Sequence, residues 1–173
     1  MKQQIVNLLV YRWRYILGYT ALVVLFVVAV TMAGIYAPGG LTQTEINTIT
    51  RTNQLAGGEF GVVNLPLHLM QLASFSLFGV SIFSIKLPAI IMSVVAGVAI
   101  FLLLRRWFKS NVTILSMLIM TATGQFIFLA QNATSHIFYV AYSTLILLFA
   151  SLILQKAKGR LAWKIGLAIS VAL

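Results

Sequence analysis

The chain contains only two acidic residues, and both lie in or near one polar stretch. Glu45 belongs to the segment GGLTQTEINTIT at residues 39–50, and Glu59 follows shortly after it. A carboxylate can accept a proton from an attacking hydroxyl group, and cations can stabilise a phosphate group as it leaves. The basic side chains and imidazoles that could work with the two carboxylates are Arg51, His68, Lys86 and His136. If one face of the protein gathers them, they could transfer a group from a lipid phosphate.

Each of these residues also has a structural interpretation. Glu45 stands three positions after Thr42, the spacing of a capping box at a helix N-terminus. Glu59 fits a solvated loop, and Lys86 could extend its charge toward lipid headgroups. The two histidines could be packing residues. Two His and two Glu at scattered positions, with no cysteine, give no metal-binding pattern, and they leave a divalent cation open as a cofactor.

The composition is that of an integral membrane protein. Of the 173 residues, 61% are hydrophobic and 8% are charged, whereas roughly a quarter are charged in soluble domains. The formal net charge of +10 would suggest a nucleic-acid partner if the protein were soluble. Here the basic residues flank apolar runs, so orientation in the membrane explains them better. We therefore expect a lipid bilayer, and no nucleic acid, as a partner.

Long apolar runs predict an all-α, polytopic membrane protein. Runs near residues 15–36, 85–104, 112–129 and 137–154 are long enough to span a bilayer, which takes about 20 residues. The first exceeds the apolar core of a cleaved signal peptide, so we interpret it as an uncleaved anchor. The run at 161–173 is an incomplete span. We expect one transmembrane domain, the N-terminal portion of a longer protein.

Residues 37–84 form the expected first outer loop. Gly39-Gly40 and Gly57-Gly58 are breakers, and the residues between them predict one short helix. A second short helix is expected between Pro66, which suits a first helical turn, and Gly79, which suits a helix end. It is too short to span comfortably.

This second short helix decides the topology. If it lies on the membrane surface, the basic clusters at 2–14, 105–109 and 156–164 all face the cytoplasm. If it spans, the last two clusters move outside, against the positive-inside bias. We therefore expect a multi-pass protein of the cell membrane with a cytoplasmic N-terminus and short interfacial helices on the outer side. The candidate side chains then meet on the outer face.

The region from Leu65 to Phe108 carries a more specific pattern. Its pieces are, in order, Leu65-Pro66-Leu67, Leu77-Phe78-Gly79-Val80-Ser81, Lys86-Leu87-Pro88 and Arg105-Arg106. The pattern resembles the protein O-mannosyltransferase and aminoarabinose-transferase type of GT-C glycosyltransferases. Their usual run reads Pro-Pro-Leu, Leu-Phe-Gly-Val-Ser, Arg-Leu-Pro and Arg-Arg. The acidic pair of their first outer loop, usually Asp-Glu, corresponds to Thr44-Glu45 here.

The resemblance implies a GT-C-like fold and a membrane glycosyltransferase. Such an enzyme moves a sugar from a polyprenyl-phosphate donor to an acceptor on the outer face, by an inverting displacement. Glu45 is then the base that activates the acceptor, or a metal contact. The residues implied in substrate binding are Lys86, Arg51, His136, Glu59 and His68, the first three as the cations that hold the donor's phosphate.

A non-catalytic function is the alternative. The same scaffold could serve as a membrane subunit, or as a protein that binds or transports a lipid-linked sugar. Thr44 favours this alternative, because it stands where the family's catalytic Asp is expected. The sugar, the acceptor, metal dependence and the oligomeric state are left open by the sequence.

Overall fold

The protein is described here by a computed structural model, which covers residues 16–21, 23–25, 28, 40–58, 64–155 and 160–172. Within these residues every regular element is an α-helix, so the expected all-α membrane fold is confirmed. Glu59 and much of the expected first span lie outside the described residues. The helical residues 16–21 and 23–25 belong to that span.

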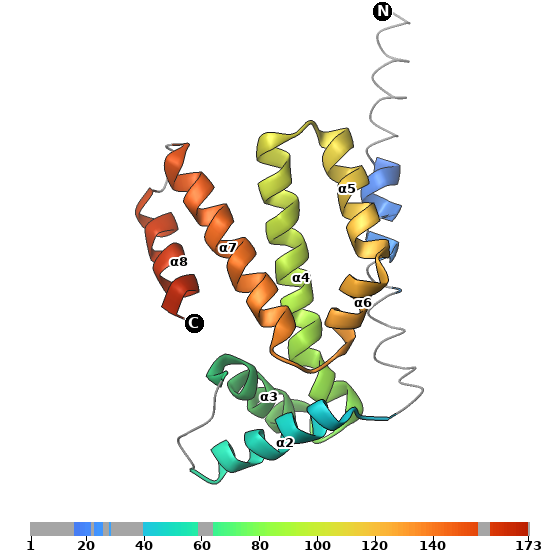
Figure 1. Ribbon diagram of the computed structural model, residues 1–173, viewed down its shortest axis with the longest axis vertical. Coiled ribbons are helices and arrows are strands. Elements are labelled where there is room, and N and C mark those ends of the chain that lie inside the picture. The colour runs from blue at the N-terminus through green and yellow to red at the C-terminus, as the bar shows by residue number, and fades with distance from the viewer. Residues whose placement is uncertain are drawn as a thin grey trace, which may run out of the picture.

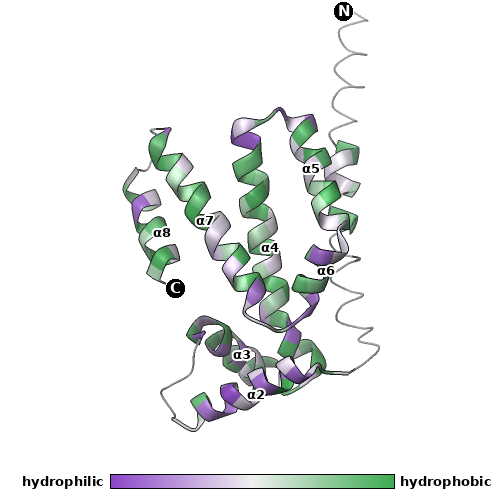
Figure 2. Ribbon diagram, in the orientation of Figure 1, coloured by the Kyte–Doolittle hydropathy of each residue, from purple (hydrophilic) through white to green (hydrophobic). Residues whose placement is uncertain are grey.

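Two described helices are long and apolar enough to cross a bilayer. They are α4 (Ile82–Trp107) and α7 (His136–Leu154), and they pack against each other. Helix α8 (Arg160–Ala172) is shorter and packs on α7. In Figure 1, α4, α5 and α7 extend away from one end of the molecule, where two further helices lie across them. Figure 2 shows that α4 is hydrophobic along most of its length and that α7 is most hydrophobic in the half away from α2 and α3.

The expected span at 112–129 is broken into two helices. These are α5 (Ser110–Ala122) and α6 (Gly124–Gln131), which meet at an angle of 63° and are apolar enough to cross a membrane as a pair. Between them Thr123 has an extended backbone, and its hydroxyl donates to the Met120 carbonyl at 2.6 Å. A hydroxyl bound back to the preceding turn, followed by a glycine, is a known cause of a helix bend.

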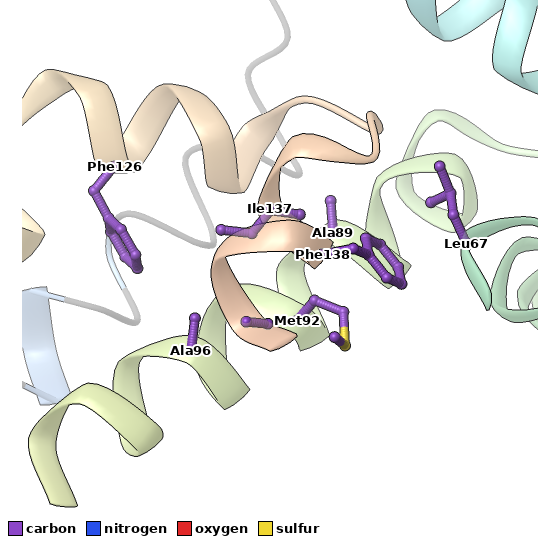
Figure 3. Close-up of a cluster of buried hydrophobic side chains, with 8 residues drawn as sticks. Leu67, Ala89, Met92, Ala96, Phe126, Ile137 and Phe138 are labelled. Carbon is purple, nitrogen blue, oxygen red and sulfur yellow. The ribbon is translucent and has the colours of Figure 1, made fainter. Parts of the chain in front are cut away.

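The two helices across the end are α2 (Gln43–Ala56) and α3 (Leu65–Phe78). They correspond to the two short helices expected in the outer loop. A buried apolar cluster joins α3 to the adjoining ends of α4, α6 and α7 (Figure 3). Its members are Leu67, Ala89, Met92, Ala96, Phe126, Ile137, Phe138 and Ala141. The core therefore lies directly beneath the platform that α2 and α3 make.

Polar contacts complete the attachment of α3 to α4. Pro88 lies inside α4 and has no N–H, so the Ser84 carbonyl lacks its usual helical partner. The Ser74 hydroxyl of α3 donates to this carbonyl at 2.8 Å. The Gln71 amide donates to the next carbonyl, that of Ile85, at 3.4 Å. The irregularity that proline creates in α4 is thus the place where α3 binds.

Helix α3 buries polar side chains and exposes apolar ones. Gln71 and Ser74 are buried against α2 and α4, whereas Leu77 is 76% exposed and Phe78 is 59% exposed. In water such a pattern would leave a large apolar surface unprotected. Against lipid it is favourable, because the apolar face meets the acyl chains while the polar face meets protein. The pattern agrees with a helix that lies in the membrane interface.

We expect the end that carries α2 and α3 to face outward. The chain has no cysteine, so single substitutions Asn53→Cys, Ser76→Cys and Asn111→Cys give clean probes, and all three positions are exposed. In intact cells a membrane-impermeant maleimide should label the first two. It should label Asn111→Cys, in the first turn of α5, only after permeabilisation. Labelling of Asn111→Cys alone in intact cells would reverse the orientation.

Candidate functional site

The N-terminus of α2 forms the capping box that its sequence predicts. The Thr42 hydroxyl accepts from the Glu45 N–H at 3.3 Å, and Glu45 Oε2 accepts from the Thr42 N–H at 2.9 Å. The pair satisfies two of the amide groups that a helix N-terminus leaves without partners. One oxygen of Glu45 therefore fixes where α2 begins.

The other oxygen of Glu45 makes contacts to distant parts of the chain. Oε1 accepts from the Ala133 N–H at 3.0 Å, and Lys86 Nζ lies 3.8 Å from the same oxygen. Glu45 is 0% exposed and Lys86 is 7% exposed. One carboxylate thus joins α2, the first turns of α4 and the short link between α6 and α7.

A buried hydrogen-bonded cluster lies further along α2. Thr52 Oγ1 lies 2.7 Å from His68 Nδ1 and 2.6 Å from Gln71 Oε1, both on α3. The Gln71 amide nitrogen donates to Ile85, so Oε1 is the atom that faces Thr52, and this oxygen can only accept. The single hydroxyl proton of Thr52 is directed to Gln71 Oε1 and to the Thr48 carbonyl at 2.9 Å, both of which only accept, so His68 Nδ1 is the atom left to donate to the Thr52 oxygen. The cluster therefore fixes the orientation of the His68 ring.

A cavity of about 220 Å³ lies where α2, the start of α3 and the start of α7 meet. The lining residues that the structure describes are polar except for one leucine. The lining residues are Thr44, Asn47, Thr48, Arg51, Asn64, Leu67, His68, Thr134, Ser135 and His136. Arg51 carries a permanent charge, and no carboxylate is among these residues. The cavity is therefore suited to a negatively charged group.

Two helix N-termini strengthen this electrostatic preference. Asn64 and Ser135 are the N-cap residues of α3 and α7, both line the cavity, and neither helix has a side-chain cap. Uncapped N-terminal amides and the helix dipole favour anions. Asn64 has a left-handed backbone with φ 68°, and its side chain accepts from the Tyr139 hydroxyl at 2.6 Å. This bond ties the start of α3 to α7 beside the cavity.

The structure divides the candidate residues of the sequence into two groups. Arg51, His68 and His136 line the cavity. Glu45 and Lys86 form the buried ion pair and are not among the lining residues. Glu59, the remaining candidate, lies outside the described residues. In the part of the chain that the structure describes, no three His, Cys, Asp or Glu side chains come together as a metal site would need.

Sequence reasoning missed most of the neutral polar lining. On α2, Thr44, Asn47, Thr48 and Arg51 follow the i, i+3, i+4, i+7 spacing of one helical face. That periodicity was a usable signal. Thr134 and Ser135 lie in a polar link between two apolar runs, and only the fold reveals which way such a link faces.

Comparison with known proteins gives one result. Residues 66–173 match the family model described as dolichyl-phosphate-mannose-protein mannosyltransferase. No curated protein and no solved structure matches the chain significantly. The matched region contains His68, Lys86 and His136 but begins after α2, so Thr44, Glu45 and Arg51 precede it.

We expect the Glu45–Lys86 pair to control stability through coupling. Glu45→Ala should lower the free energy of unfolding by about 3–5 kcal/mol, because it leaves a buried ammonium group without its partner. Glu45→Gln should cost less, since an amide oxygen can still accept hydrogen bonds. Adding Lys86→Met to Glu45→Gln should recover most of that loss. Unfolding of purified protein in mixed detergent micelles measures each value.

The matched control is Lys109→Met, which removes an exposed basic residue at the opposite end of α4. Combined with Glu45→Gln it should recover nothing. If the losses in unfolding free energy from Glu45→Gln and Lys86→Met simply add in the double variant, the ion pair is contradicted, because only residues that do not interact have additive effects.

Proposed function

Because the chain belongs to the dolichyl-phosphate-mannose-protein mannosyltransferase family, we propose that it transfers a sugar from a polyprenyl-phosphate-linked donor to an acceptor on the outer face of the membrane. Membership supports a membrane glycosyltransferase in general. The observation that carries the more specific proposal is the cation-bearing cavity at one end of the spanning helices. A lipid-linked substrate reaches such a site from the bilayer with its phosphate at the level of the headgroups.

The proposed reaction breaks the bond between the anomeric carbon and a phosphate oxygen. Negative charge grows on the phosphate as this bond lengthens, and prearranged cations and amide groups stabilise that charge. Arg51, His136 and the uncapped starts of α3 and α7 are the groups that would do so in this cavity. Lys86, the third expected phosphate contact, is paired with Glu45. It would contribute only after leaving that carboxylate.

Glu45 has two proposed roles with different consequences. As the general base, it would take the proton of the attacking acceptor, and it would have to turn from Lys86 and Ala133 toward the cavity. As an anchor, it would hold α2 in place and never meet substrate. Its complete burial and the bonds at both oxygens favour the anchor. Glu45 follows Thr44, which lines the cavity, so the carboxylate lies close enough to the cavity for the role of general base to be tested.

A second candidate function is favoured by Thr44. This residue lines the cavity at the position where the family resemblance expects an acid, and the described lining contains no carboxylate. A protein with this cavity could bind a lipid-linked sugar without transferring it.

The two roles of Glu45 can be separated by sugar transfer from a polyprenyl-phosphate mannose donor. We expect Glu45→Gln in the full-length protein to lose activity in proportion to its lost stability. Glu45→Gln with Lys86→Met should regain activity along with stability, because a neutral pair restores the anchor. A general base behaves otherwise. Its removal should cost roughly 10²–10⁴-fold in rate, and no change at Lys86 should restore it.

Lys86→Met alone shows how far the loss of Lys86 itself lowers transfer. If Lys86→Met alone transfers sugar and the stable double variant does not, the anchor is contradicted and Glu45 is the base. Thr44→Asp provides the comparison for the second candidate function. Absence of transfer by the wild type, with transfer appearing in Thr44→Asp, would establish a binding protein that lacks its acid.

Arg51 should contribute directly to donor binding. We expect Arg51→Gln to raise the dissociation constant for farnesyl phosphate, a short polyprenyl phosphate, by roughly 10-fold or more, because it removes a charge-assisted hydrogen bond. Arg105→Gln is the matched control, since it removes an exposed charge of the same kind near the other end of α4. Equal affinities for the two variants, measured by calorimetry in zwitterionic lipid nanodiscs, would exclude Arg51 from the donor site.

A further inference from the structure

The side chain of Thr134 has an unmet hydrogen-bonding requirement. Thr134 lies in the link between α6 and α7, and its Oγ1 is buried without any partner. Among the residues that the structure describes, no other buried side-chain nitrogen or oxygen is in this condition. Buried hydroxyl groups nearly always have partners, because losing water without replacement is unfavourable. An unpaired hydroxyl in the wall of a cavity therefore marks a place where a ligand can supply the partner.

The backbone around Thr134 is held firmly. The preceding Ala133 N–H donates to buried Glu45, and the Thr134 N–H donates to the Asn132 carbonyl at 2.8 Å. The following residue, Ser135, is the N-cap residue of α7. The side chain can therefore change its surroundings only by rotating about its own Cα–Cβ bond.

Such a rotation is enough to bring the hydroxyl to the cavity. Thr134 lines the cavity although its oxygen is shielded from solvent. A change of rotamer exchanges the places of the hydroxyl, the methyl group and the hydrogen on Cβ. The methyl group is close in size to the hydroxyl and has no hydrogen-bonding requirement, so it can fill the buried place that the oxygen leaves.

We propose that Thr134 is a substrate-binding residue, whose hydroxyl rotates into the cavity and donates a hydrogen bond to a phosphate oxygen of the lipid-linked donor. The proposal rests on the donor function proposed above. A phosphate oxygen is the partner because the same cavity holds Arg51, His136 and the uncapped start of α7, which together attract an anion. The Thr134 hydroxyl adds a hydrogen bond of defined direction, which attraction between opposite charges alone does not provide.

The test uses the opposite effects that one substitution should have on stability and on binding. Thr134→Val keeps the shape and removes the unpaired hydroxyl, so the ligand-free protein should melt at the same temperature as wild type or higher. The same variant should bind farnesyl phosphate roughly 10-fold more weakly, because the phosphate loses a hydrogen-bond donor. Thr134→Ser retains the hydroxyl and should bind within about threefold of wild type. A residue with only a structural role would not give this combination.

Thr121→Val is the matched control. The Thr121 hydroxyl is also buried, but it donates to the Met117 carbonyl at 2.8 Å and does not line the cavity. This variant should bind farnesyl phosphate as wild type does. All variants are compared as full-length protein in phosphatidylcholine nanodiscs, by calorimetry for binding and by thermal unfolding for stability.

Three ligands identify what the hydroxyl recognises. Farnesyl phosphate should bind more tightly than inorganic phosphate, and farnesol, which lacks the phosphate, should show no difference between wild type and Thr134→Val. Equal affinity for inorganic phosphate and farnesyl phosphate would make this a general anion site and overturn the lipid donor. A loss of farnesol binding in Thr134→Val would mean that the residue acts through the fold.

The failures of the two proposals are distinguishable. If Arg51→Gln weakens farnesyl phosphate binding and Thr134→Val does not, the role of Thr134 is wrong while the donor site stands. If Thr134→Val lowers the melting temperature, its hydroxyl has a structural partner and the inference is wrong. If wild-type protein binds no farnesyl phosphate, both proposals are overturned.

Discussion

The arrangement of the cavity depends on one buried carboxylate. Glu45 caps α2 with one oxygen, and with the other it meets Lys86 of α4 and the backbone of the link between α6 and α7. A charge in such a place is unfavourable unless its partners are held in position. Movement of α2 away from α4 or the link would leave charge or backbone polar groups unpaired. Since α2 and this link also line the cavity, the contacts of Glu45 hold two of its walls in place.

The platform is attached to the spans by buried polar groups as well as by the apolar cluster under α3. At the membrane interface lipid solvates apolar side chains, so exposing Leu77 and Phe78 has little cost. Buried polar groups between α3 and α4 then determine where α3 binds along α4. The carbonyl left unpaired by Pro88 is a fixed acceptor on α4, and Ser74 is placed to donate to it. Together with the apolar cluster under α3, these bonds fix the platform on the spans.

Much of this fold could be predicted from local sequence signals. Apolar run length gave α4 and α7, and the Thr42–Glu45 spacing gave the start of α2, because both depend on neighbours in the chain. The bend at Thr123 could not be predicted from apolarity, since the two halves are similarly apolar. The contact of Glu45 with Lys86 and Ala133 joins residues far apart in sequence, and it depends on how the spans pack. The orphaned hydroxyl of Thr134 is likewise a property of packing alone.

Thr44 and Glu45 affect two different properties of the site: the first affects the charge of the cavity, and the second holds α2 in place. Successive residues on an α-helix point about 100° apart, and only the first of these two neighbours is among the residues that line the cavity. Thr44 faces it, and Glu45 faces the protein interior. An acidic pair at these positions, as the family resemblance expects, would place one carboxylate in the cavity and one in the anchor. A threonine at the first position leaves the anchor intact and removes negative charge from the cavity. The charge of the cavity can therefore change without disturbing the contacts that hold α2 in place, and among the described lining residues Arg51 carries the permanent charge.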